Sequence, residues 1–433
     1  MRASGNPAFL RRAVIANCLL GSIQRFCVPG PVLQLIAVSL FGVTAVQYSY
    51  VATVFAFLSF FQLAGLYFQY RSDAYRPLII SYDVRIVALL LCGASFLLAP
   101  DATPAAALLF FAAAAAINIC HMTGFNVSWP LIMRAWTTAE DRGTTIATLR
   151  SVQAAFAALI ALAISVLGSS GHFRTFLIAL FVVFALYSFF SARQVAWMKE
   201  TGPPLTRTSG TGGVFVALRQ DFRTLWNDPI YRALAFIVAV ASFSLIPLQV
   251  FFLRDVMSIG EDKLFWFVTS MVWAGIAATQ AWGRLSDKLG TPRTLQLTAA
   301  ANVVAVLAIC LIVSWWLFTG EHPSVLAWIA ATALLVSSIS FQGFSIGWYS
   351  AALEVIPKDC TSLGVLLLSI LTEFAIAASA FVVGFIREWS TSSVPVRELS
   401  IAAILLAVAL VTYAATAAWT LSRRRATTTQ AVA

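Results

Sequence analysis

The sequence predicts an all-α polytopic membrane protein with twelve transmembrane helices in two pseudo-symmetric six-helix bundles. Two observations predict this fold class. First, 60% of the 433 residues are hydrophobic, 11% are charged, and the mean hydropathy is +0.86. A soluble domain is about 45–50% apolar and about 25% charged, so a soluble enzyme, a nucleic-acid-binding domain and a disordered chain are excluded. Second, apolar residues run without alternation, as in Ala105–Ile119, whereas β-barrel strands alternate apolar and polar residues.

Twelve stretches of the chain are apolar and long enough to cross a bilayer, which takes about 20 residues of helix. Charged or turn-forming residues bound each of them. The first stretch is too long for the apolar core of a cleavable signal, so we expect it to be a retained helix. The predicted spans are 12–39, 47–69, 78–99, 104–132, 144–168, 174–194, 230–254, 263–283, 294–318, 325–353, 362–386 and 399–421.

A long polar segment, 195–229, divides these spans into two groups of six. It contains Gly202-Pro203-Pro204 and the glycine- and threonine-rich stretch 208–213, which are typical of a flexible linker. The sequence therefore predicts an N-terminal bundle over 1–194, a cytoplasmic linker over 195–229 and a C-terminal bundle over 230–433.

The Lys and Arg residues predict the orientation of the chain. With a cytoplasmic N-terminus, 21 of the 28 cations lie on the cytoplasmic side and five lie outside, while Arg25 and Arg85 fall inside spans. Cytoplasmic loops carry the excess of Lys and Arg in membrane proteins. Both termini and the linker are thus predicted to face the cytoplasm at the cell (inner) membrane. The net charge of +10 marks this side, and we expect no nucleic-acid partner.

The loop between predicted spans 8 and 9 has the sequence GRLSDKLGTPR over residues 283–293. Gly283 would permit close helix approach, and Gly290 would allow a tight turn with positive φ. The loop resembles the signature G-x-x-x-D-[RK]-x-G-x-[RK]-[RK] of the major facilitator superfamily of secondary transporters. It matches at Gly283, Asp287, Lys288, Gly290 and Arg293 and departs at Pro292. The corresponding loop of the first half, 65–77, matches poorly. The resemblance implies that residues 283–293 form a conformational latch.

Two ionisable side chains are predicted near the middle of spans, where a charge costs several kcal/mol and usually faces a cavity or a partner. Arg25 in span 1 either binds an anionic group of a substrate or forms a structural ion pair or gate. Glu373 in span 11 either carries a coupling proton or is a buried partner for a cation or a polar network. Asp83 and Arg85 are placed near the interface at the start of span 3, which favours snorkelling or local pairing over a role in gating.

Helical spacing collects other polar residues onto single faces of spans 1, 4, 7 and 10, and the resemblance implies that these four spans line the central cavity. In span 7, Pro247 is expected to kink the helix between Ser242 and Gln249. His121 is also a candidate proton relay. We expect no metal there, because no Cys or carboxylate lies three or four residues after it. The candidate substrate-binding residues are Asn17, Gln24, Arg25, Asn118, His121, Gln249, Gln342 and Trp348.

These features together favour a secondary active transporter rather than an enzyme. It would move a small organic anion or polar metabolite by alternating access, driven by protons. We expect a monomer in the lipid bilayer with a small-molecule substrate and no cofactor. A sugar or drug exporter of the same fold, and a non-transporting assembly factor or sensor, remain alternatives. A membrane-embedded enzyme is disfavoured, because the chain has three His residues and no visible catalytic constellation.

Overall fold

The computed structural model describes residues 7–71, 73–98, 104–137, 139–168, 171–203, 205, 213–244, 248–320, 326–357 and 360–432. Within these ranges the regular secondary structure is helical throughout, as predicted. The first half of the chain forms α1 (Pro7–Asn17), α2 (Leu20–Cys27), α3 (Pro31–Phe41), α4 (Ala45–Leu58), α5 (Phe61–Arg71), α6 (Tyr75–Leu98), α7 (Pro104–Cys120), the π-helix η1 (His121–Phe125), α8 (Asn126–Trp136), α9 (Ala139–Leu167) and α10 (Phe173–Thr201).

The remaining helices follow the segment that was predicted to be a linker. They are α11 (Gly213–Asn227), α12 (Pro229–Ser242), α13 (Gln249–Phe251), the π-helix η3 (Phe252–Val256), α14 (Glu261–Leu289), α15 (Thr291–Thr319), α16 (Ala327–Val355), α17 (Thr361–Trp389) and α18 (Val394–Val432). The segment 195–229 is therefore helical in part, because α10 continues to Thr201 and α11 occupies its second half.

Two compact units divide the chain. The N-terminal unit comprises residues 1–43 and 57–219, and the C-terminal unit comprises residues 44–56 and 220–433. Most of α4 thus belongs to the C-terminal unit, although it precedes the linker in sequence. Within that unit the ring of Tyr48 on α4 lies 5.5 Å from the ring of Phe251, and Ser49 contacts the backbone at Gly384 of α17.

Nine helical segments in the described part of the chain are long and apolar enough to cross a membrane. A tenth is added if the bent pair Pro7–Cys27 and Pro31–Phe41, which meet at 54°, forms one span. Two shorter apolar helices, Ser151–Leu167 and Pro229–Ser242, coincide with predicted spans 5 and 7. The multi-pass helical class is confirmed, while the total of twelve spans stays a prediction.

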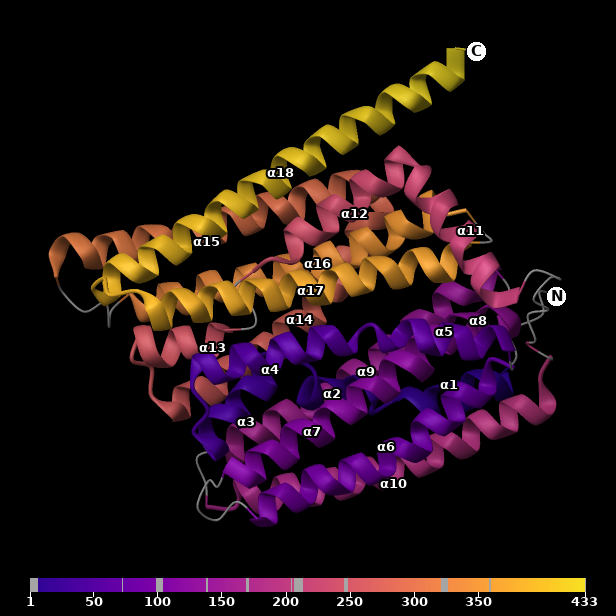
Figure 1. Ribbon diagram of the computed structural model, residues 1–433, viewed down its shortest axis with the longest axis horizontal. Coiled ribbons are helices and arrows are strands. Elements are labelled where there is room, and N and C mark those ends of the chain that lie inside the picture. The colour runs from indigo at the N-terminus through magenta and orange to yellow at the C-terminus, as the bar shows by residue number, and fades with distance from the viewer. Residues whose placement is uncertain are drawn as a thin grey trace. The chain divides into compact units, whose positions relative to one another are not determined.

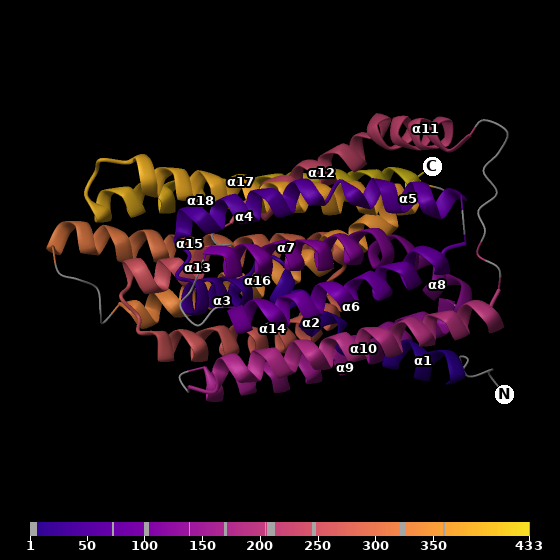
Figure 2. The same ribbon diagram turned by 60° about the horizontal axis from the view of Figure 1, so that its bottom comes forward.

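In the N-terminal unit, α6 and α10 run side by side along most of their length (Figures 1 and 2). A cluster around Tyr82, Ile132 and Val195 fills one part of this unit. A second cluster consists of aromatic rings whose centroids lie 5–6 Å apart, which is the spacing that edge-to-face and offset pairs prefer. It includes Phe26, Phe41, Phe96, Phe110, Phe181 and Phe184.

In the C-terminal unit, α15 packs against both α16 and α18. The close approach depends on two glycines one turn apart on α16. A Cβ at Gly343 would lie 2.6 Å from Thr298 and Trp282, and a Cβ at Gly347 would lie 2.8 Å from Leu295. Small residues four apart let transmembrane helices approach closely, where dispersion contacts accumulate.

Three of the four spans predicted to line the cavity are irregular. Span 1 bends between α2 and α3, span 4 contains the π-helix η1, and span 7 is interrupted between Ser242 and Gln249. Pro247, the expected cause of the span 7 kink, lies outside the described residues. Broken spans and π-helices occur often at functional sites, since they re-aim side chains and expose backbone groups.

Candidate functional site

Among the described residues of the N-terminal unit, the most deeply buried cation is Arg85, which was expected to lie near the interface. Arg85 is 0% exposed, and none of its three guanidinium nitrogens has a hydrogen-bond partner. Its guanidinium carbon lies 4.8 Å from the ring centroid of Tyr82, one turn earlier on α6. Snorkelling is thereby excluded for Arg85, because seven residues of the predicted span precede it and α6 turns its side chain into the bundle. Asp83 lies on the exposed side of the same helix.

His121 and Asn118 belong to the helices that pack against α6. His121 begins the π-helix, is 7% exposed, and has an unpaired Nδ1 atom. Its ring stacks on Phe125 at 4.9 Å, and Phe125 stacks on Trp129 at 5.4 Å. Asn118, one turn earlier, is buried with its Nδ2 unpaired. Arg85 interacts electrostatically with His121.

The candidate residues of span 1 have different surroundings. Asn17 is buried and donates from Nδ2 to the carbonyl oxygen of Ala13 at 2.8 Å, which is a bond within its own helix. Gln24 and Arg25 are half-buried. Arg25 lies in the last turn of α2 and has no hydrogen bond or ion pair with any described residue. The negative end of the α2 dipole stabilises a cation at this position.

The candidate residues of the C-terminal unit surround the interruption of span 7. Gln249 is 0% exposed, its Oε1 accepts a 3.4 Å hydrogen bond from Ser338 Oγ of α16, and its Nε2 is unpaired. The polar faces predicted on spans 7 and 10 therefore meet at these two residues. Ser242, however, does not share a helical face with Gln249, because α12 ends at Ser242 and α13 begins at Gln249.

A small polar cavity adjoins this interruption. One part has a volume of about 20 Å³ and a neighbouring part about 10 Å³, and both are lined by Ser244, Asn302 and Ser337. Ser337 Oγ donates to Asn302 Oδ1 at 2.8 Å, while Ser244 Oγ is unpaired. A buried water needs about 10–15 Å³ of such space and two to four polar partners, so the cavity can hold one or two waters.

Gln342, Trp348 and Glu373 lie apart from this cavity. Gln342 and Trp348 are half-buried on α16, where Gln342 contacts the position of Gly275 and the Trp348 ring meets Tyr349 edge-on at 6.0 Å. Glu373 is half-buried in the middle of α17 and has no hydrogen bond or ion pair with any described residue. Among the described residues, no group of three His, Cys, Asp or Glu side chains is placed to hold a metal ion.

Comparison with protein families decides the class of this arrangement. The family model described as Major Facilitator Superfamily matches residues 15–380, which is most of the chain. The chain belongs to the major facilitator superfamily. It is therefore a multi-pass membrane transporter and not an enzyme. A comparison of the sequence with curated proteins gives no match.

Solved structures of other transporters share the fold of this superfamily member. A D-xylose-proton symporter is similar with a TM-score of 0.69 at 10% identity, over 95% of this chain and 96% of that one. A bacterial homologue of the iron transporter ferroportin, in an inward-facing state, has a TM-score of 0.65 at 16% identity, over 96% and 98%. A nucleoside transporter, NupG, has a TM-score of 0.61 at 13% identity, over 95% and 98%. At these identities the likeness shows the fold alone.

The superfamily loop over residues 283–293 joins α14 to α15. Gly290 has φ +81°, so the predicted positive-φ turn is confirmed. Gly283 does not mediate the expected helix approach, because no described heavy atom lies within 4 Å of the position that its Cβ would take. Lys288 and Arg293 are exposed, and the side chain of Asp287 lies outside the described residues. Thr291 Oγ1 donates to Glu354 Oε1 at 2.8 Å, which ties this loop to the end of α16.

Sequence reasoning missed three residues of this transporter, Arg85, Asn302 and Ser337. Arg85 was missed although the sequence carried a signal, since Ile80, Val84, Val87 and Leu91 are spaced as one apolar face of a helix that excludes Arg85. In the structure this face is exposed and Arg85 is buried. Asn302 and Ser337 had no comparable signal, because single polar residues in long apolar helices also serve as packing contacts.

Proposed function

We propose that this chain is a proton-driven secondary transporter that moves a small organic anion or polar metabolite across the cytoplasmic membrane by alternating access. The observation that carries the choice of an anion is Arg25, a half-buried guanidinium without a partner among the described residues. A guanidinium offers five donors in a planar fork that matches a carboxylate. The proposal includes a monomer with both termini in the cytoplasm, as the distribution of Lys and Arg predicts.

Glu373 is the proposed proton carrier. It lies in the middle of α17 without a described partner, where a carboxylate is costly and a protonated carboxyl group is less so. His121 is the second candidate for proton transfer, and residues 283–293 are the proposed latch. Proton coupling in the similar xylose symporter is consistent with this proposal but is a property of that protein.

Uptake by proteoliposomes tests the proposal. Purified full-length protein is reconstituted with an inward proton gradient and given a panel of labelled mono- and dicarboxylates. We expect concentrative uptake of at least one of them, abolished by a protonophore. Arg25→Gln is expected to raise KM about 30-fold, which corresponds to the roughly 2 kcal/mol lost with one charge-assisted contact. Glu373→Gln is expected to remove proton-driven accumulation while counterflow exchange persists.

Two surface variants serve as matched controls. Arg193→Gln removes an exposed guanidinium of α10, and Glu200→Gln removes an exposed carboxylate of the same helix. Both are expected to transport like the wild type. If the wild type moves no carboxylate under any gradient, or if Arg25→Gln and Glu373→Gln match these controls, the proposed function is wrong.

A further inference from the structure

The guanidinium of Arg85 lacks a counter-charge. It is fully buried, and each of its nitrogens is unpaired. An arginine side chain stays protonated in proteins. A buried charge costs several kcal/mol even after relaxation, and its contact with the Tyr82 ring returns about 2 kcal/mol or less. Another group must therefore balance Arg85 when it is buried in this way.

The described acidic side chains of the N-terminal unit do not provide that group. Asp73 forms an ion pair with Lys199 at 3.0 Å. Asp83 and Glu200 are exposed. The described part of this unit thus contains a buried cation and no buried carboxylate.

Polar side chains on α7 and η1, which pack against α6, can donate hydrogen bonds. His121 and Cys120 are close enough to interact electrostatically with it. Asn118 Nδ2 is a donor without an acceptor, and Nδ1 of His121 is also unpaired. A buried polar atom without a partner costs about 1–3 kcal/mol. An unpaired guanidinium close to an imidazole with an unpaired nitrogen, and an unpaired amide donor one turn from that imidazole, are complementary to an anion and not to a metal ion.

We propose that Arg85, Asn118 and His121 form a binding site for one monovalent anion inside the N-terminal unit. The guanidinium supplies the charge and a fork of donors, Asn118 supplies an amide donor, and the π-helix sets the direction of the His121 ring. The anion is a halide from solution or the carboxylate of the transported solute. In the second case the inference rests on the proposed function and deepens it.

Anion-dependent thermal unfolding of the detergent-solubilised full-length protein tests the site without any transport. The protein is held in HEPES, whose bulky sulfonate is the sole starting anion, and sodium chloride or sodium acetate is titrated at constant ionic strength. A ligand at 100 times its dissociation constant is expected to raise the midpoint of wild-type unfolding by about 3 °C, with saturation. Response to chloride identifies a halide site, and response to acetate alone identifies a carboxylate site.

Single-residue variants show which side chains are needed for the anion-dependent rise in the unfolding midpoint. Arg85→Gln is expected to abolish the saturable rise, while Arg193→Gln, which removes an exposed guanidinium of the same unit, keeps it. In HEPES alone, Arg85→Gln is expected to unfold no earlier than the wild type, because it removes an uncompensated charge. A purely structural Arg85 would give the opposite result, with earlier unfolding in every salt. Asn118→Leu is expected to weaken the apparent anion affinity about tenfold.

A wild-type protein with no saturable response to either anion overturns the proposal, whether or not Arg85→Gln folds. A response that persists unchanged in Arg85→Gln also overturns it. Loss of uptake in proteoliposomes alone, with the anion response intact, contradicts the proposed transport function and leaves the anion site standing. The two proposals therefore fail separately.

Discussion

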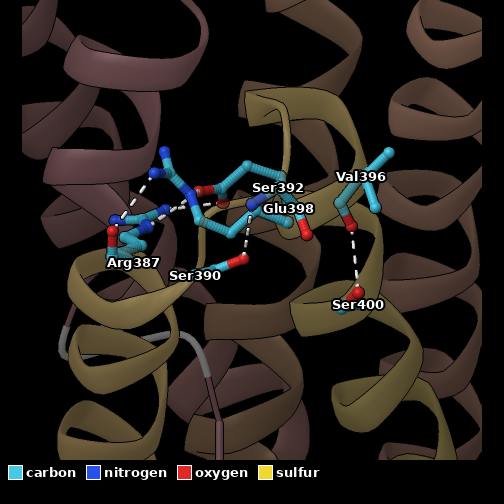
Figure 3. A network of polar contacts seen from close by, with 7 residues as sticks. Arg387, Ser390, Ser392, Val396, Glu398 and Ser400 are labelled. Carbon is cyan, nitrogen blue, oxygen red and sulfur yellow. Dashed lines mark hydrogen bonds and ion pairs between the residues drawn. The ribbon is translucent and has the colours of Figure 1, made fainter.

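Arg387 and Glu398 form a two-point ion pair at the connection between α17 and α18. Arg387 Nε and Nη2 donate to the two carboxylate oxygens at 3.0 and 2.8 Å, and Figure 3 shows the two side chains directed toward each other. Arg397 adds a second guanidinium, with its Nε 3.5 Å from Glu398 Oε1 and its Nη1 bonded to the Arg387 carbonyl oxygen. One buried carboxylate therefore serves two cations and holds the ends of two helices together.

Glu398→Gln should strongly destabilise the C-terminal unit. The side chains of Glu398 and Arg387 are 1% and 8% exposed, so the change leaves a buried guanidinium without its anion. Loss of one partner of a buried pair costs about 3–5 kcal/mol. The measurement is thermal unfolding in detergent. Glu388→Gln, an exposed carboxylate beside Arg387, should shift stability by less than about 0.5 kcal/mol. Equal midpoints for the two variants would show that the pair is not stabilising.

Gly65→Ala should destabilise the N-terminal unit by about 2 kcal/mol. A Cβ at this position of α5 would lie 2.8–2.9 Å from backbone atoms of Thr123 in the π-helix, and backbone atoms cannot rotate away. Gly283→Ala in α14 is the matched change, because its Cβ meets no described atom and alanine favours a helix by up to about 1 kcal/mol. Chemical unfolding measures the free energy of unfolding of both variants, and we expect a loss for Gly65→Ala alone. Equal stability of the two would contradict the close packing of α5 against η1.

His121→Phe and His121→Ala should differ in stability. Phenylalanine preserves the stack on Phe125 and removes an unpaired ring nitrogen, so stability should change by less than about 1 kcal/mol. Alanine loses the stack and leaves a void, at a cost of about 2–4 kcal/mol. Thermal unfolding compares the stability of the two variants. Proteoliposome uptake across a pH series then compares the pH dependence of transport. Unchanged pH dependence in His121→Phe would exclude His121 as a proton relay.

Gln249→Leu should leave stability unchanged or raise it, because Nε2 is buried without a partner and a leucine of similar size needs none. Ser337→Ala should cost about 1 kcal/mol, since it breaks the 2.8 Å bond to Asn302. The unfolding midpoints of both variants, measured against the wild type, test these two expected stability changes. If Gln249→Leu is the less stable of the two, then Gln249 is held by a stronger contact than its bond to Ser338.

The limits of sequence reasoning are clearest at Arg85 and Gly283. The position of Arg85 within its span was known, but its burial depends on which way α6 turns in the bundle and on the π-helix that packs against it. Gly283 matched the superfamily signature, but its surroundings are set by helices far away in sequence. At Gly290 the expectation was correct, because a tight turn between two helices is a local backbone requirement.

Hydropathy and the loop signature alone were sufficient for the multi-pass helical class and the superfamily, because both are local properties of the chain. They were not sufficient for the bend after α2, the interruption after Ser242 or the grouping of Thr44–Ala56 with the C-terminal unit. Those features, the unpaired Arg85 and the ion pair of Arg387 with Glu398 depend on which helices become neighbours. Helix neighbours are selected by packing and by the cost of burying unpaired polar groups, and both terms are summed over residues distant in sequence.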